Sequence, residues 1–329
     1  MITMRNSLIS PSCFSVIPHD FALLVPQKIK TEVFEILKMN VSTQALSLKS
    51  FSNKNFHIQN VEPDFSNYVL RIPDALSNFF SSRANEKKNL ESAFLLGVCP
   101  LEIQYFDEKT GVMVTNFIKD CIPLSSNSFS NIELRKQAIQ HLKLIHNSNM
   151  PFQNSFSRFF RLAKMNELLN EFVKDSKFFE LYSILKENDA QISEDHFVKV
   201  PCHNDPSPEN FILKFGKMYT LDWENSALND PMWDLAHFSA ILILSAEEEE
   251  CLLNFYNPED FESARDKCYY FKPFIHLASA AWALYHLETK NFVCNEELLK
   301  KIYDERIELS QNLFINRKYQ DALMRLKTH

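Results

Sequence analysis

Apolar positions along the chain change their spacing near residue 120. Before that point, β-prone runs surround one long helical segment at 82–96. After it, apolar residues recur every three or four positions, as on the face formed by Leu134, Ala138, Leu142 and Ile145. The pattern predicts an α+β protein with a β-rich N-terminal part and a larger, mainly helical C-terminal part. Predicted strands are 44–48, 55–59, 67–72, 101–106, 112–117, 211–213 and 218–221, and predicted helices are 28–39, 82–96, 134–145, 155–172, 176–187, 274–289 and further turns within 296–325.

The size of the chain suits two lobes. It has 329 residues, of which 45% are apolar, and this is enough to bury a large core. We expect the lobe boundary near Lys119, which gives a first lobe at 1–118 and a second at 119–329. Within the first, residues 1–26 are broken by prolines and are expected to form an irregular extension.

Composition excludes several classes of protein. The net charge of −7 argues against a dedicated nucleic-acid binder. The seven cysteines show no CxxC spacing, so we expect reduced thiols in a cytoplasmic protein. The apolar runs are too short to span a bilayer, so no membrane insertion is expected, and the oligomeric state stays open between monomer and homodimer. With only three glycines, the chain contains neither a P-loop nor a GxGxxG fingerprint.

Residues 201–234 carry the clearest chemical signal. Asp205 follows His203 by two positions, and four residues separate it from Asn210. This is the spacing of the protein-kinase catalytic loop, in which the Asp receives the proton of the attacking hydroxyl and the Asn holds Mg²⁺. Asp222 ends the predicted hairpin and offers a second oxygen ligand, which suits a hard cation. Single Asp and Asn residues are common in turns, so the indication rests on their joint spacing.

The same stretch resembles a known family. The segments HNDPSPENFIL and LDWENSALNDPMWDLA are similar to the signature of choline and ethanolamine kinases, especially the bacterial type. These belong with the aminoglycoside phosphotransferases in the two-lobed protein-kinase-like fold. The resemblance extends from about Ser47 to Glu288 and is tight only within 201–236. It implies an enzyme that uses ATP and Mg²⁺ to phosphorylate the hydroxyl of a small amino alcohol, choline above others.

The resemblance also implies roles within the 201–236 segment. Asp205 would act as the catalytic base, with Asn210 and Asp222 as the metal ligands. His203 would brace the loop by hydrogen bonding, and Asp234 would support it from the next helix.

Further roles for the first lobe follow from the resemblance. Lys54 lies in an Asn-Lys-Asn segment that matches the nucleotide loop of the family, although the usual glycine is missing. Arg71 would contact ATP phosphates and pair with Glu86 from the following helix. The backbone of the connector, at Asn116 and Ile118, would bind adenine.

The alcohol site is expected to be aromatic. Trp282 and Tyr285 lie three positions apart on a predicted helix, so both rings share a face and could bind a quaternary ammonium by cation–π attraction. Glu224 could add negative charge, and Trp223 could add a further ring. His286 is expected to point away from the aromatic pair and is given no role. Core packing is the ordinary alternative for such a pair.

Three alternatives stay open at this point. The substrate could be ethanolamine, thiamine or an aminoglycoside, and the last would need carboxylates in place of aromatic rings. The missing glycine also fits a catalytically inactive binding module. A purely structural helical protein is the third alternative, but it leaves the spacing of Asp205, Asn210 and Asp222 unexplained.

Overall fold

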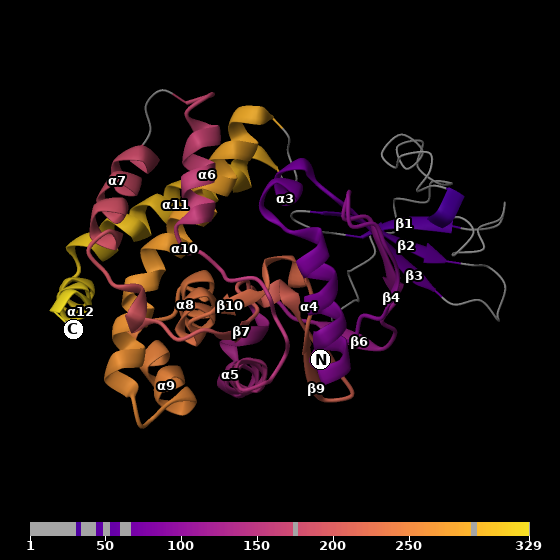
Figure 1. Ribbon diagram of the computed structural model, residues 1–329, viewed down its shortest axis with the longest axis horizontal. Helices are drawn as coiled ribbons and strands as arrows, with labels where there is room; N and C mark the ends of the chain where they lie inside the picture. The colour runs from indigo at the N-terminus through magenta and orange to yellow at the C-terminus, as the bar shows by residue number, and fades with distance from the viewer. Residues whose placement is uncertain are drawn as a thin grey trace, which may run out of the picture. The chain divides into compact units, whose positions relative to one another are not determined.

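The computed structural model describes residues 31–33, 44–48, 53–59, 67–173, 177–290 and 295–328. The chain divides into two compact units, Met1–Asp120 and Cys121–His329 (Figure 1). The expected extension at 1–26, most of the helix expected at 28–39, and Ser52 of the nucleotide loop lie outside the described residues.

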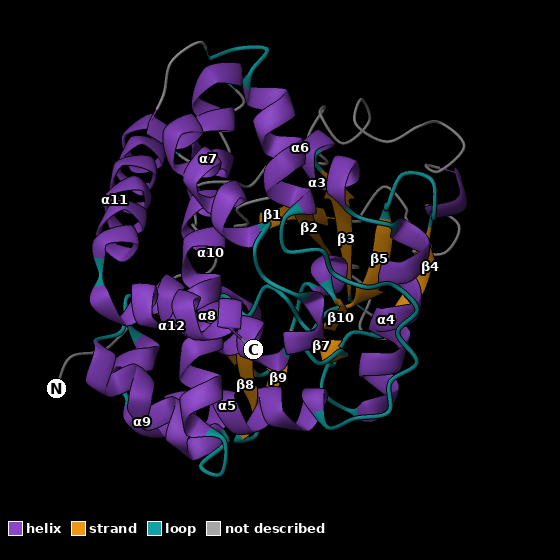
Figure 2. Ribbon diagram, turned by 60° about the vertical axis from the view of Figure 1, so that its left-hand side comes forward, coloured by secondary structure: helices purple, strands orange, loops and turns teal. Residues whose placement is uncertain are grey.

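The first unit contains a five-stranded antiparallel sheet in the order β1-β2-β3-β5-β4 (Figure 2). Alternation along the strands sends one set of side chains into a shared core, which includes Phe56, Leu70 and Val114. The predicted strands of this unit are confirmed with small shifts of their ends. They are β1 Gln44–Leu48, β2 Asn53–Gln59, β3 Tyr68–Pro73, β4 Ile103–Phe106 and β5 Met113–Asn116.

Two helices follow β3. The first, α3 (Ala75–Phe80), is capped by the Asp74 side chain, which accepts a hydrogen bond from the Ser77 N–H. The second, α4 (Arg83–Leu96), matches the predicted helix and ends at Gly97, whose φ of 74° is accessible to glycine at little cost. The sequence pattern had not indicated α3, because a six-residue helix is too short to show periodicity.

The second unit is mainly helical, with two small sheets. β8 pairs with β6 and β9 in one sheet, and β7 pairs with β10 in the other. The strands are β6 Cys121–Pro123, β7 Val200–Cys202, β8 Phe211–Lys214, β9 Lys217–Thr220 and β10 Ala227–Asn229. The helices are α5 Ile132–His146, α6 Phe160–Leu169, α7 Lys177–Asp189, α8 Pro231–Leu242, α9 Ala246–Tyr256, α10 Phe261–Thr289, α11 Glu296–Ile315 and α12 Arg317–Thr328.

Helix α10 is the centre of this unit, and it packs against α6, α8, α11 and α12 (Figure 2). The prediction started this helix at Phe274, directly after Pro273, a residue that removes a backbone donor and usually ends a helix. That start is wrong: the helix begins at Phe261 and continues through Pro273. Pro273 and most of its neighbours are buried, so tertiary packing outweighs the local cost of the proline.

Among the described helices, none combines the length and apolar character needed to cross a membrane.

Candidate active site

The loop that carries Asp205 lies between two paired strands. β7 leads into it, and β10, which follows Asp222, returns antiparallel to β7 with Ala227 opposite Cys202. The hairpin of β8 and β9 fills the interval, and the Leu221 N–H donates to the Asn210 carbonyl over 2.8 Å. This backbone bond brings the residue before Asp222 beside Asn210, so the two predicted metal ligands lie on adjoining segments.

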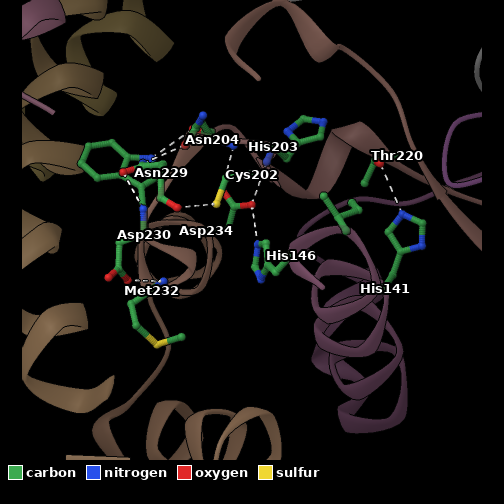
Figure 3. Close-up of polar contacts among 12 residues, drawn as sticks. His141, His146, Cys202, His203, Asn204, Thr220, Asn229, Asp230, Met232 and Asp234 are labelled. Atoms are coloured by element: carbon green, nitrogen blue, oxygen red, sulfur yellow. Dashed lines mark hydrogen bonds and ion pairs between the residues drawn. The ribbon is translucent and has the colours of Figure 1, made fainter. Parts of the chain in front are cut away.

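Asp234, on α8, fixes the backbone of the loop. Its two carboxylate oxygens accept from the N–H of His203 (2.9 Å) and the N–H of Asn204 (2.7 Å), and His146 adds a ring contact of 3.0 Å (Figure 3). Asn204 has a φ of 65°, a conformation that asparagine tolerates better than most residues. The Trp233 indole N–H donates to the Asn204 carbonyl, which further restrains this peptide. The predicted supporting role of Asp234 is confirmed.

His203 ties the loop to the end of the hairpin. Its Nδ1 accepts from the Asp205 N–H over 3.3 Å, so the ring proton lies on Nε2, which donates to the Leu221 carbonyl over 2.8 Å. The His203 imidazole thereby holds both Asp205 and Leu221, the residue before Asp222. The predicted bracing role of His203 is confirmed, and its ring is fully buried.

A buried cluster of His146, Cys202 and Asp234 has the spacing of a metal site, with ligand atoms within 4.8 Å of one another. Each group is nevertheless committed elsewhere. Asp234 binds two backbone N–H groups, His146 also contacts the Tyr256 hydroxyl, and the Cys202 thiol donates to the Asn229 carbonyl (Figure 3). Burial raises the pKa of the Cys202 thiol well above its usual value, which disfavours a thiolate ligand. We interpret the cluster as structural.

Asn210 and Asp222 offer the oxygen atoms that Mg²⁺ prefers. The Asn210 amide nitrogen donates to the Asp205 carbonyl over 2.9 Å, so its amide oxygen is the atom suited to a cation. Asp222 is partly exposed and has a φ of 58°, a left-handed conformation outside the two flanking elements. One carboxylate and one amide leave the remaining positions of an octahedral ion to phosphates and water. The residues fit a magnesium–nucleotide complex.

The carboxylate of Asp205 has three side-chain neighbours. Oδ1 accepts from the Ser207 hydroxyl over 2.7 Å and lies 3.4 Å from the Nε2 of His237. Oδ2 accepts from the Asn225 amide nitrogen over 3.3 Å. Burial alone would raise the pKa of Asp205, but His237, Ser207 and the nearby positive charge of Arg161 outweigh it and hold the pKa below its usual value. Asp205 is therefore ionised at neutral pH, as a proton acceptor must be.

The orientation of the Asn225 amide follows from a second contact. Its oxygen accepts from Nη2 of Arg161, on α6, over 2.7 Å. Because arginine can only donate, the amide nitrogen must face Asp205. Sequence reasoning missed Ser207, Asn225, His237 and Arg161. Ser207 and Asn225 lie within the two segments that carry the family resemblance and could have been found there, whereas His237 and Arg161 lie outside them.

In the first unit, the predicted ion pair between Arg71 and Glu86 is confirmed, and all of its groups are buried. Sequence reasoning missed Arg83, which donates to the other oxygen of Glu86 over 2.6 Å and to the Ser77 hydroxyl over 2.7 Å. Gly111 makes room for this cluster, because a Cβ there would lie 2.4 Å from Nε of Arg83. Two guanidinium groups thus share one carboxylate.

The other residues expected to bind nucleotide are placed as follows. Lys54 is exposed but belongs to β2, opposite Ile72 of β3, so the expectation that it lies in a loop is wrong. The ladder explains the difference, because Asn53 and Lys54 pair with Pro73 and Ile72 and so start β2 two residues before the predicted strand. The Asn116 N–H donates to the Glu102 carbonyl and its side chain binds the segment before β4. Ile118 follows this strand and is partly exposed.

The aromatic residues divide into two groups. Trp282 and Tyr285 on α10 are partly exposed, whereas Trp223 is buried and its indole N–H donates to the Thr220 carbonyl. Trp223 therefore packs beneath the loop, against His203, and we leave it out of the substrate site. Glu224 next to it is partly exposed.

His286 does not point away from the aromatic pair. Its ring centroid lies 4.8 Å from that of Trp282 and 5.5 Å from that of Tyr285, so the earlier expectation is wrong. The prediction considered only its adjacency to Tyr285. It overlooked the i,i+4 relation to Trp282, which places both on one face of the helix.

The sequence of this chain is similar to those of known proteins. The model of the phosphotransferase enzyme family matches residues 132–265, which include the Asp205 loop and α8. The protein LicA of Haemophilus influenzae is 31% identical over 236 residues, which cover 68% of this chain and 66% of that protein. LicA of H. influenzae strain Rd is 32% identical over 198 residues, which cover 57% of this chain and 71% of that protein.

The fold has a counterpart among solved structures. The crystal structure of choline kinase LicA from Streptococcus pneumoniae has a TM-score of 0.70 at 22% identity, and the match covers 92% of this chain and 100% of that one. The fold is therefore the protein-kinase-like one, with a β-rich first part and a mainly helical second part. The family match and the LicA relatives show that the chain belongs to the phosphotransferase enzyme family and, within it, to the LicA proteins.

Proposed function

We propose that this protein transfers the γ-phosphoryl group of ATP to the hydroxyl of a small amino alcohol, and that choline is the preferred acceptor. The observation that carries the proposal is the setting of Asp205. This ionised carboxylate lies in a loop whose backbone is fixed by Asp234 and His203, and the loop adjoins two oxygen ligands for a metal. Membership of the phosphotransferase enzyme family supports the reaction class.

The proposed step is an in-line displacement. The acceptor oxygen forms a bond to the γ-phosphorus while the bond from that phosphorus to the β–γ bridging oxygen breaks, and ADP leaves with the electron pair. The proton of the hydroxyl passes to the Asp205 carboxylate. Because the loop is held by backbone hydrogen bonds, the carboxylate needs little rearrangement before reaction, which is how positioning lowers a barrier.

Asn210 and Asp222 would hold Mg²⁺ through the amide oxygen and the carboxylate. When bound, this ion neutralises charge on the β- and γ-phosphates. The contribution of the chain is to keep these two oxygen atoms on adjoining segments, through the Leu221–Asn210 backbone bond and the hairpin.

We propose that the first unit, which the sequence predicted as residues 1–118, binds the nucleotide. Arg71 would contact phosphates while Glu86 holds its side chain, and Lys54, with the backbone at Asn116 and Ile118, would complete the site. Two guanidinium groups gathered on one carboxylate, as Arg71 and Arg83 are on Glu86, support binding of a polyphosphate.

For the acceptor we propose a site that includes Trp282, Tyr285 and Glu224. A quaternary ammonium offers no N–H donor, so aromatic faces and a carboxylate are the groups that can recognise it. The LicA structure from S. pneumoniae is described as a choline kinase, which supports choline above the other alcohols. We also propose a cytoplasmic setting, which the scattered positions of the seven cysteines in the sequence support.

The test is a screen of acceptors. The purified protein is supplied with ATP and Mg²⁺ and with choline, ethanolamine, thiamine or an aminoglycoside, and ADP release and the phosphorylated product are measured. We expect the highest kcat/KM with choline, and a KM for choline raised about tenfold or more by Trp282→Ala, since a desolvated cation–π contact contributes roughly 2 kcal/mol.

Trp223→Phe is the matched control. It should lower Tm and leave the KM for choline within about twofold, because that ring is buried. Preference for an aminoglycoside would contradict the choline assignment. Equal KM values for choline in Trp282→Ala and wild type would contradict the aromatic site.

A further inference from the structure

The ring of His237 lies beside the carboxylate of Asp205. It lies on α8, three residues after Asp234, and its Nε2 is 3.4 Å from Oδ1 of Asp205. The side chain is largely buried, with 13% of its surface exposed, against 30% for Asp205. No function assigned above uses it.

The environment of His237 fixes where its proton lies. Nδ1 is buried and, within the part of the chain that the structure describes, has no hydrogen-bond partner. A proton there would lack an acceptor, whereas a proton on Nε2 faces a carboxylate. Burial lowers the pKa of His237 although Asp205 and Asp234 oppose it, so the ring is neutral at pH 7. Its neutral tautomer is therefore the Nε2–H form.

Other charged groups around His237 agree with a neutral ring. Arg306 on α11 lowers its pKa by charge repulsion. Arg306 lies against the C-terminal end of α8, where it donates to the Ala240 carbonyl, and it also contacts His276 of α10. The positive charge of Arg306 thus opposes a second proton on His237.

The two oxygens of Asp205 are not equivalent. Oδ1 receives the Ser207 hydroxyl and faces the His237 ring, whereas Oδ2 receives only the longer contact of 3.3 Å from Asn225 among the described residues. A carboxylate oxygen has two lone pairs, so Oδ1 is saturated once His237 donates to it, and Oδ2 retains one lone pair. The 3.4 Å separation is long for a hydrogen bond, but such contacts shorten in the reacting complex.

We propose that His237 is a positioning residue for phosphoryl transfer. Its Nε2–H and the Ser207 hydroxyl hold Oδ1 of Asp205, so that Oδ2 is the atom that takes the proton of the acceptor hydroxyl. This inference rests on the proposed function, in which Asp205 is the base. It assigns to α8 a second task beside the support that Asp234 gives to the backbone.

Three substitutions at one position test the proposal. In His237→Gln the side-chain amide nitrogen reaches the place of Nε2, in His237→Asn it reaches only the place of Nδ1, and His237→Leu has no donor. We expect His237→Leu and His237→Asn to lower kcat about tenfold, and His237→Gln to stay within about threefold of wild type, since a hydrogen bond to a charged group is lost only in the first two. KM for ATP should change by less than about twofold in all three.

His141→Leu is the matched control. It removes another buried imidazole of the same unit, one that contacts Thr220 and not Asp205. We expect it to lower Tm, and we expect His141→Gln and His141→Asn to show none of the difference in kcat that separates Gln from Asn at His237. If kcat follows Tm across the His237 series, with Gln and Asn alike, or if His237→Leu keeps wild-type kcat, the proposal is overturned.

A second measurement does not depend on activity. Nitrogen chemical shifts of labelled histidine should show the neutral Nε2–H form of His237 at pH 7, and Asp205→Ala should change its Nε2 shift. An Nδ1–H form would overturn the proposal whatever alcohol the enzyme phosphorylates. If the wild-type protein phosphorylates none of the tested alcohols while His237 is in the Nε2–H form, the proposed function fails and the contact between His237 and Asp205 is supported.

Discussion

The two units hold their key side chains by different means. In the second unit, the Asp205 loop is fixed mainly by hydrogen bonds to backbone groups, with Asp234 on two N–H groups and His203 on an N–H and a carbonyl. In the first unit, Arg71 is held by charge, through a carboxylate that it shares with Arg83. The difference suits the tasks we propose, because a base must be placed accurately whereas a phosphate contact depends chiefly on charge.

The largest expected effect on stability comes from breaking the backbone support. Asp234→Ala leaves two buried N–H groups and His146 without their acceptor, and each unsatisfied buried group costs about 1–3 kcal/mol. We therefore expect a loss of about 4 kcal/mol in the free energy of unfolding, measured by chemical denaturation, together with loss of transfer activity. Asp266→Ala is the control, since its partner Arg325 is about half exposed and the expected loss is below about 1 kcal/mol.

Asp234 also predicts a dependence on pH. Burial would raise the pKa of its carboxyl, but His146, His203 and the backbone N–H group outweigh it and lower the pKa. Because the pKa of Asp234 is lower in the folded state, its ionised carboxylate stabilises the fold at any pH above the pKa of an unfolded Asp, about 3.9. This stabilisation is lost as the pH falls through the pKa of the folded state. The difference in stability between wild type and Asp234→Ala should therefore shrink in acid. A constant difference from pH 7 down to pH 2 would contradict the assignment.

A smaller effect is expected from breaking the charge cluster. Glu86→Gln removes the buried carboxylate that two guanidinium groups share and should cost about 3 kcal/mol of unfolding free energy. It should also raise the KM for ATP while the KM for the acceptor changes little. The control is Glu108→Gln, since the pair of Glu108 with Lys87 is exposed and should contribute below about 1 kcal/mol. Equal losses of unfolding free energy in Glu86→Gln and Glu108→Gln would contradict the larger contribution that we assign to the buried cluster.

Local patterns predicted much of this molecule. Strand alternation and the hairpin between Phe211 and Thr220 depend on neighbouring residues, so they were visible in the sequence. The Arg71–Glu86 pair was also predicted, from the family resemblance together with the order of strand and helix. The lobe division and the roles of the site residues beyond these contacts stay predictions.

The rest depends on contacts between distant segments. His237 and Arg161 come from two different elements, and nothing in their local sequence indicates that they lie near Asp205. The start of α10 was misplaced because Pro273 is a strong local signal, and its burial is a property of the whole unit. Local rules fail where tertiary packing decides.

The most direct test of the account is the rate of phosphocholine formation by Asp205→Ala, measured beside ATP binding by the same variant. We expect kcat to fall about thousandfold, within the range for loss of a general base, while the Kd for ATP stays within about twofold of wild type. A variant that binds ATP and keeps more than about a tenth of the wild-type kcat would contradict the central claim that Asp205 accepts the proton.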